Sequence, residues 1–206
     1  MIRLVLIRHG ETDWNVEGRM QGQKDRPLND RGRKQAELTG QYVRNHFQPE
    51  VVWSSDLARC VSTAEPLGFD FQKSELLREI NYGTLEGKTW AETSREEQAE
   101  SAEYGSDPYH QMAGGESRAD LVERAAKFMA VSEITKLDGD VVIVGHGASL
   151  SGMLTHLLGL PPEAAYKFQL ENASVTTLNI TPELTRLTAL SLATHLEAVN
   201  EAVNRD

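Results

Sequence analysis

The chain has 206 residues, of which 39% are hydrophobic and 25% charged, an ordinary globular balance, and its 16 glycines and 7 prolines exclude collagen-like and low-complexity linker proteins. Acidic residues outnumber basic ones by 31 to 21, and the resulting net charge of −10 disfavours nucleic acid and anionic membranes as partners. A single cysteine cannot form an internal disulfide, which is typical of a reducing compartment, so we expect a cytoplasmic protein.

The first half of the chain alternates between strand and helix signals. Residues 2–7 are apolar except for Arg3, as in a strand buried on both faces, and the run is too short for a signal peptide. A helix is expected from about residue 31 to 46, and a second strand over residues 50–54. A helix over about residues 56–67 should end at Gly68, and weak strand signals lie at residues 69–71 and 75–77.

The second half repeats this alternation after a polar, acid-rich region at about residues 88–115, which we interpret as a helical excursion within one domain of residues 1–206. A long helix is expected over residues 117–136 and a helix over residues 147–158. Strands are expected over residues 141–144, 175–180 and 186–192, and a C-terminal tail from about residue 196. The pattern predicts an α/β fold with a mainly parallel, mixed sheet between two helical layers.

One stretch is long enough to suggest a membrane span. Residues 141–162 contain no Asp, Glu, Lys or Arg. They do contain His146, Ser149, Thr155 and His156, and they end in two prolines, so a buried strand, turn and helix explain them better.

Two of the predicted strands end in similar sequences, Arg8-His9-Gly10 and Gly145-His146-Gly147. Ligands of open parallel sheets bind beyond the carboxyl ends of the strands. A single histidine there is most often a hydrogen-bonded, half-buried residue. Two at equivalent positions, one of them preceded by an arginine, favour a functional site.

Around these histidines the sequence resembles the histidine phosphatase superfamily, in its phosphoglycerate-mutase-like branch, from about residue 2 to 195. The ordered motifs that carry the resemblance are residues 6–15 (LIRHGETDWN), 18–22 (GRMQG), 54–59 (SSDLAR), 77–83 (LREINYG), 114–117 (GGES), 144–147 (VGHG) and 172–174 (NAS). The resemblance implies a three-layer α/β/α sandwich with the helical insert over the active site.

The resemblance and the chemistry of phosphate assign the same central residues. Two guanidinium groups, those of Arg8 and Arg59, can hold a phosphoryl group because their fork geometry matches phosphate and they stay charged. His9 is the candidate nucleophile, which would form a phosphohistidine through a neutral ring nitrogen. His146 is expected to donate to the transferring phosphoryl group in its protonated form.

Glu79 is the candidate acid and base, since one carboxyl group can protonate the leaving alcohol and later activate water. The resemblance places Asn15, Gln21, Gly22 and Gly147 against the substrate phosphate. Gln21 stands where the mutase branch usually has a small hydroxyl residue. Chemistry of this type needs no metal and no cofactor.

Three acidic residues of the same motifs, Glu11, Asp13 and Glu86, are expected to be structural. Cys60 is expected to be a small buried hydrophobe.

These features favour a phosphatase of small phosphomonoesters, with phosphoglycerate mutase as the alternative. Residues 89–108 carry six acidic residues against Arg95 alone, which suits a second phosphate poorly. The motif at Glu79-Ile80-Asn81 also departs from the Glu-Arg-His of mutases.

Two further hypotheses assign the chain to other classes of protein. A serine hydrolase would use Ser149 of Gly147-Ala-Ser-Leu-Ser151, but the fifth position of that elbow should be glycine. A non-enzymatic binding module that only kept the fold would be expected to lack one of the two arginines or two histidines, and all four are present. The sequence leaves open whether the substrate is a sugar phosphate, a phosphoglycerate derivative, phosphoserine or α-ribazole phosphate, and whether the chain forms a homodimer.

Overall fold

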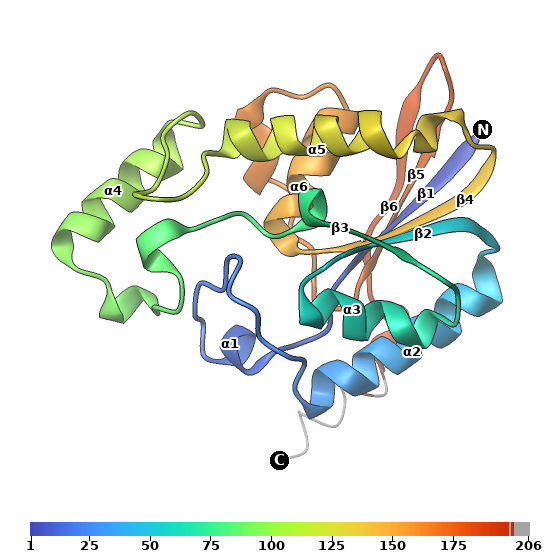
Figure 1. The fold of residues 1–206 in the computed structure, drawn as a ribbon, viewed down its shortest axis with the longest axis horizontal. Coiled ribbons are helices and arrows are strands. Elements are labelled where there is room, and N and C mark those ends of the chain that lie inside the picture. Colours follow the sequence, from blue (N-terminus) through green and yellow to red (C-terminus); the bar gives the residue numbers. More distant parts are fainter. Residues whose placement is uncertain (198, 200–206) are drawn as a thin grey trace.

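A computed structural model describes residues 1–197 and 199, in which six strands form one mixed sheet (Figure 1). The sheet has the order β3-β2-β4-β1-β5-β6. Its strands are β1 (Ile2–Arg8), β2 (Pro49–Ser55), β3 (Gln72–Ser74), β4 (Gly139–Gly145), β5 (Val175–Ile180) and β6 (Thr185–Leu192). The first four strands of this order are parallel to one another, and β5 and β6 are antiparallel to their neighbours. The predicted α/β class with a mainly parallel, mixed sheet is confirmed.

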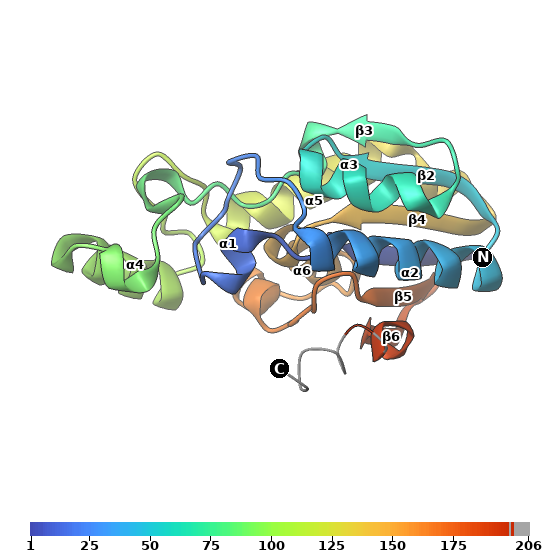
Figure 2. The ribbon, with the colours of Figure 1, turned by 90° about the horizontal axis from the view of Figure 1, so that it is seen from below.

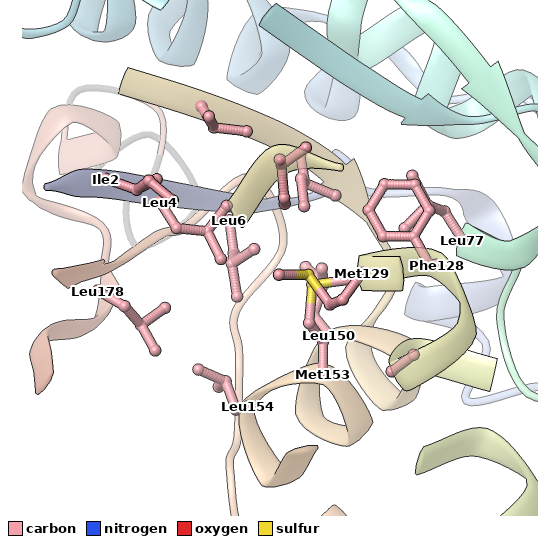
Figure 3. Packing of buried hydrophobic residues seen from close by; sticks show 14 of the residues in the cluster. Ile2, Leu4, Leu6, Leu77, Phe128, Met129, Leu150, Met153, Leu154 and Leu178 are labelled. Carbon is pink, nitrogen blue, oxygen red and sulfur yellow. The ribbon is translucent and has the colours of Figure 1, made fainter. Parts of the chain in front are cut away.

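The two central strands have apolar side chains on both faces. Alternate residues of a strand point to opposite sides, so Leu4 and Leu6 pack in one core while Val5 and Ile7 pack in the other. Figure 3 shows the first core, where Leu6 lies with Leu150, Met153 and other buried side chains. Burial on both faces explains why these strands read as continuous apolar runs.

Helices cover each face of the sheet, which gives the three layers seen in Figures 1 and 2. The helices α2 (Asp30–His46) and α3 (Ala58–Ala64) pack on the Val5 side, and α5 (Arg118–Ser132) and α6 (Gly147–Leu157) pack on the Leu4 side. Capping boxes begin α1, α4, α5 and α6, and the Asn29 side chain accepts from the Gly32 amide at the start of α2.

The predicted insert contains α4 (Arg95–Ser106), which projects from one end of the molecule (Figures 1 and 2). Its buried residue Tyr104 joins a small cluster with Ile80 and Leu121, and its hydroxyl is hydrogen-bonded to that of Tyr166. The remaining helical elements are α1 (Asp13–Val16) and the short 3-10 segments Glu65–Leu67, Glu75–Leu77, Gly83–Leu85, Trp90–Glu92, Ile134–Lys136, Pro162–Tyr166 and Thr194–Leu196.

Several predicted boundaries differ from the structure. The weak strand signals at residues 69–71 and 75–77 are wrong, because β3 lies between them and is fixed by pairing with β2 rather than by its own hydrophobicity. The helix predicted from residue 56 begins at Ala58, because the backbone of its N-cap residue, Leu57, is extended (ψ 138°). The helix predicted to residue 136 ends at Ser132, where Glu133 has a left-handed backbone (φ 53°).

Residues 141–162 form β4 and α6, as expected, rather than a span. Within the described residues, no helix is long and apolar enough to cross a membrane. Most of the expected C-terminal tail, residues 198 and 200–206, lies outside the described part of the chain.

A close backbone approach fixes the loop that follows β1. A Cβ built on Gly10 would lie 2.5 Å from the Gly32 carbonyl oxygen, and one on Gly32 would lie 2.0 Å from the Glu11 carbonyl oxygen. No side chain fits at either position, so the first turn of α2 packs directly against the segment that contains His9.

We expect Gly32→Ala to displace this loop, because backbone atoms cannot move aside as a flexible side chain can. The variant should lose about 1–3 kcal/mol of unfolding free energy, the usual cost of overpacking. Urea denaturation measures the change. Gly105→Ala in α4 is the matched control, since a Cβ there has nothing within 4 Å. Equal stability of the two variants would contradict this interpretation.

Candidate active site

The ends of β1 and β4 bring the two predicted histidines together. These strands are parallel neighbours with Arg8 opposite Gly145, so the next residues, His9 and His146, leave the sheet at the same edge. Their ring centroids are 5.1 Å apart, in an edge-to-face arrangement. Parallel register alone therefore pairs two residues that are 137 positions apart in the sequence.

A cavity of about 230 Å³ opens at this edge and contains most of the predicted site. Its wall includes seven of those residues, namely Arg8, His9, Asn15, Gln21, Gly22, Arg59 and Glu79. Gly147 instead lines a larger adjoining cavity of about 640 Å³, which shares Arg8, Glu79 and Tyr82 with the first. His146 lines neither cavity and is fully buried.

The ring of His9 is held in one tautomer. Its Nδ1 lies 2.7 Å from the carbonyl oxygen of Gly10, which can only accept, so Nδ1 carries the proton and Nε2 keeps its lone pair. Burial, and then the charges of Arg59 and Arg8, hold the pKa of His9 well below its usual value. The imidazole is therefore neutral at physiological pH, which is the form that a nucleophile requires.

Arg8 and Arg59 place positive charge beside His9. Arg59 is fully buried, and its Nη1 and Nη2 donate to the carbonyls of Lys24 (2.9 Å) and Gly22 (2.7 Å). Arg8 donates through Nη1 to the Leu170 carbonyl (2.6 Å), while its buried Nε has no partner among the described atoms. Burial lowers the pKa of both groups, but a guanidinium stays charged in proteins. Arg8 therefore has a positive charge and an unused N–H donor with which it can bind an anion.

His146 is buried against Arg59 and does not form part of the cavity wall. Arg59 Nε donates to its Nδ1 (3.0 Å), and its Nε2 then donates to Ser55 Oγ (2.9 Å) and lies 3.3 Å from Cys60 Sγ. Burial holds the pKa of His146 well below its usual value, so this ring is neutral too. Donation from protonated His146 to a phosphoryl group therefore requires Arg59 Nε to release Nδ1 first.

Glu79 faces both cavities from an irregular segment, and backbone amides hold its carboxylate. Oε1 accepts from the amides of Ile80 and Ser149, each at 2.9 Å, and Oε2 accepts from that of Ala148 at 3.1 Å. The latter two amides belong to the first turn of α6, where unpaired N–H groups attract negative charge. A Cβ built on Gly147 would lie 3.5 Å from Arg8 Nε and 3.8 Å from Glu79 Oε2, so the start of α6 lies beside both charged groups.

The loop after β1 supplies the remaining wall. Thr12 and Asn15 form a capping box, and the Asn15 carboxamide oxygen accepts from the Thr12 amide, which leaves its NH₂ group for the cavity. Gln21 is 8% exposed, and its buried Oε1 has no partner among the described atoms. Gly22 has a left-handed backbone (φ 53°) and lies against the Glu86 carboxylate.

Two of the three acidic residues expected to be structural, Glu11 and Glu86, have structural contacts, whereas Asp13 is exposed in the first turn of α1. Glu11 accepts from Asn29 Nδ2 at 3.0 Å and pairs with Arg31 at 2.8 Å, which ties the loop to α2. Glu86 accepts from the amides of Gln23 and Tyr82. Cys60 is fully buried in the second core, as expected of a small hydrophobe, although it also touches His146.

Other residues that hold the site were not assigned a role from the sequence. Asn172 Nδ2 donates to the carbonyl of His9 (3.1 Å), and Thr63 Oγ1 accepts from the amide of Gly10 (3.0 Å). Asn172 lies in the NAS motif, which is a usable signal. Arg124 and Glu116 form hydrogen bonds with the backbone around Glu79. Arg124 lies within the helix α5, where no sequence motif marks it as part of the site.

Chemically, the cavity combines a neutral imidazole nitrogen, two guanidinium groups and a carboxylate with room for a small anion. Within the described residues, no group of three or more His, Cys, Asp or Glu side chains is placed to hold a metal ion. The serine proposed for a hydrolase elbow, Ser149, donates its hydroxyl to the His146 carbonyl at 3.4 Å and does not line either cavity.

Comparison with known proteins gives consistent matches over nearly the whole chain. Residues 4–192 match the profile of the histidine phosphatase superfamily (branch 1). The probable phosphoglycerate mutase GpmB of Salmonella paratyphi C is 32% identical over 184 residues, which cover 87% of this chain and 85% of that protein.

Among solved structures, a mutant phosphoserine phosphatase from Entamoeba histolytica in complex with phosphoserine superimposes with a TM-score of 0.84 at 30% identity. The match covers 95% of this chain and 100% of that one. A mycobacterial glucosyl-3-phosphoglycerate phosphatase gives a TM-score of 0.81 at 33% identity, over 92% and 98% of the two chains. On this sequence match and these shared folds, the chain belongs to the histidine phosphatase superfamily.

Proposed function

We propose that this protein is a phosphatase that hydrolyses small phosphomonoesters through a phosphohistidine on His9. The observation that carries the proposal is the fixed tautomer of His9, whose Nδ1 donates to the Gly10 carbonyl (2.7 Å) so that Nε2 retains its lone pair in a cavity that the guanidinium groups of Arg8 and Arg59 also line. A phosphate dianion is attracted by Arg8 and Arg59, and a neutral imidazole in the same cavity is able to attack it.

In the first step, His9 Nε2 forms a bond to phosphorus while the bond from phosphorus to the ester oxygen breaks. The departing alkoxide takes a proton from Glu79, which enters this step as the carboxylic acid formed in the preceding turnover and leaves it as the carboxylate that the three backbone amides hold. Charge on the transferring group is stabilised by Arg8 and Arg59, as phosphoryl transfer depends mainly on positioning and electrostatics.

In the second step, the Glu79 carboxylate takes a proton from water as the water oxygen attacks phosphorus. The bond between phosphorus and Nε2 breaks, inorganic phosphate is released, and both Glu79 and neutral His9 are regenerated. Position supports this double role, since Glu79 lines both the smaller cavity beside His9 and the larger one next to it.

Hydrolysis is favoured over mutase activity by the charges around the cavity. A mutase must grip a second anionic group, yet the insert between residues 89 and 108 contains one basic residue, Arg95, which is exposed and lines neither cavity. Two further arginines line the cavities, and both are in ion pairs: Arg19 of the smaller cavity is paired with Glu17 and Glu92, both at 2.5 Å, and Arg31 of the larger one is paired with Glu11 at 2.8 Å. Relatives named as phosphatases of phosphoserine and of glucosyl-3-phosphoglycerate support the same class.

His9→Ala should abolish phosphate release from a panel of phosphomonoesters and should also abolish the phosphoenzyme. Wild-type protein quenched during turnover of labelled substrate should carry label that is stable to base and labile to acid. His156→Ala, a histidine near the other end of α6, is the matched control and should keep the label. Turnover that survives in His9→Ala would exclude the covalent route, and conversion of 3-phosphoglycerate to its isomer without phosphate release would favour a mutase.

Glu79→Gln should lose activity in proportion to the help that the leaving group needs. General acid catalysis contributes about 10²–10⁴ in rate, so an alkyl phosphate should lose most of that factor. p-Nitrophenyl phosphate should lose clearly less, or show a burst of p-nitrophenol when breakdown of the phosphoenzyme limits turnover. Glu11→Gln, which loosens the Arg31 pair, should affect both substrates equally. Equal losses in Glu79→Gln without a burst would show that another group is the acid.

The neutral state of His9 should also appear as a pH dependence of stability. Since its native pKa lies below the unfolded value, the unfolded chain binds an extra proton as the pH falls below about 6.5. Wild-type protein should therefore lose up to about 1.4 kcal/mol per pH unit there from this residue alone. In His9→Asn, urea unfolding between pH 7.5 and 5 should lack that contribution. Parallel stability curves for the two proteins would contradict a neutral buried His9.

A further inference from the structure

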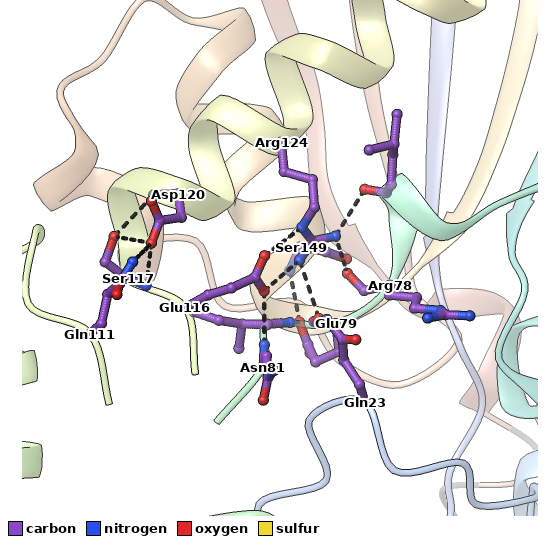
Figure 4. A network of polar contacts seen from close by, with 12 residues as sticks. Gln23, Arg78, Glu79, Asn81, Gln111, Glu116, Ser117, Asp120, Arg124 and Ser149 are labelled. Atoms are coloured by element: carbon purple, nitrogen blue, oxygen red, sulfur yellow. Dashed lines mark hydrogen bonds and ion pairs between the residues drawn. The ribbon is translucent and has the colours of Figure 1, made fainter. Parts of the chain in front are cut away.

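The segment that contains Glu79 has no regular secondary structure of its own. Between Arg78 and Tyr82 the chain is neither helix nor strand, so its backbone groups need partners from elsewhere. Gln23 donates to the Glu79 carbonyl and Glu86 accepts from the Tyr82 amide, but most of the remaining partners come from α5 and from Glu116, the residue just before its N-cap (Figure 4).

Arg124 of α5 uses all five of its N–H donors on this segment and on one carboxylate. Its Nη1 donates to the carbonyls of Leu76 (2.9 Å) and Arg78 (2.7 Å), and its Nη2 donates to that of Glu79 (3.2 Å). The remaining donors, one on Nε and one on Nη2, bind the Glu116 carboxylate at 2.8 and 3.0 Å. A guanidinium has five donors in a fixed fork and an ammonium has three, so lysine cannot reproduce this arrangement.

Glu116 binds the backbone on the other side of Glu79, and we call the pair of Arg124 and Glu116 the clamp. Its Oε2 accepts from the Asn81 amide at 2.9 Å, and its own amide donates to the Asn81 carbonyl at 2.9 Å. The Arg124 and Glu116 side chains are 14% and 21% exposed, so the pair is partly shielded from water. Together the two residues bond to the backbone on both sides of Glu79.

We infer that Arg124 and Glu116 are positioning residues that aim the Glu79 carboxylate at the cavity and at the first turn of α6. Neither residue lines the cavity beside His9, so both act through Glu79. The phosphate-binding arginines, Arg8 and Arg59, have no contact with the clamp among the described hydrogen bonds. Loss of the clamp should therefore impair proton transfer and leave binding of the phosphoryl group intact. The inference rests on the proposed function, in which Glu79 is the acid and base.

The test is the Arg124→Lys variant, which keeps the charge and removes two donors. A shift of a catalytic group by about 1 Å can cost about 10²-fold, so kcat on an alkyl phosphate should fall by about 10- to 100-fold with KM little changed. The loss on p-nitrophenyl phosphate should be smaller, as for Glu79→Gln. Lys127→Gln, which removes an exposed charge one turn along α5, is the matched control and should keep wild-type kinetics.

A double mutant separates positioning from general damage to the fold. In a Glu79→Gln background, Arg124→Lys should have no further effect that depends on the leaving group, whereas a merely structural role would add the same loss as in wild type. Amide exchange of the peptide over residues 76–82 should also rise in Arg124→Lys. If that variant unfolds, Glu116→Gln is the milder substitution, since it replaces only one oxygen of the clamp.

Each outcome bears on one proposal or on both. Equal losses on the two substrates, or additive losses in the double mutant, would overturn the positioning role while leaving a leaving-group effect of Glu79→Gln intact. Absence of that effect in Glu79→Gln itself would overturn the role of Glu79 and the inference together.

Discussion

The parallel pairing of β1 with β4 is the constraint on which the site depends. Because the two strands run in the same direction and in register, Arg8 lies opposite Gly145, and two distant histidines leave the sheet side by side. A shift of register by one residue would turn every side chain of β1 to the other face. The apolar cores prevent such a shift, since Leu4 and Val5 belong to different clusters. The burial of apolar side chains on two faces therefore sets the position of a polar site at the strand ends.

Beyond the strands, the site is made of irregular backbone whose hydrogen bonds are supplied by buried side chains. Arg59 donates to the carbonyls of Gly22 and Lys24, and Asn172 donates to that of His9. Arg124 does the same for the segment around Glu79. An unpaired buried backbone group costs about as much as a lost hydrogen bond, so each of these side chains stabilises a loop that would otherwise be unfavourable. These hydrogen bonds fix the backbone of each loop and so hold its functional groups at the cavity.

The charged groups of the site are Arg8, Arg59 and the Glu79 carboxylate, whereas His9 and His146 are neutral. The two guanidinium groups lower the pKa of both His9 and His146, in addition to the larger effect of burial. The Glu79 carboxylate lies near Arg8 and at the N-terminal turn of α6, so its charge is compensated from two sides. Positive charge is thereby concentrated where a phosphoryl group would bind, and the nucleophile remains unprotonated beside it.

The α/β class, the strands β1 and β4, and seven of the residues that line the cavity beside His9 were predictable from sequence alone. Those features depend on local patterns: an apolar run without alternation, a glycine after a histidine, and short motifs that resemble those of the histidine phosphatase superfamily. Even the acidic character of the insert, and the paucity of cations in it, could be read from composition alone.

Three features depend instead on tertiary contacts: the short edge strand β3, the neutral and buried state of His146, and the clamp made by Arg124 and Glu116. Each of these depends on a partner far away in the sequence. β3 is defined by its pairing with β2, the tautomer of His146 by Arg59 and Ser55, and the role of Arg124 by carbonyls 45–48 residues away. Local sequence patterns carry no information about such partners, because hydrogen bonds between distant segments exist only once the sheet and its helices have assembled.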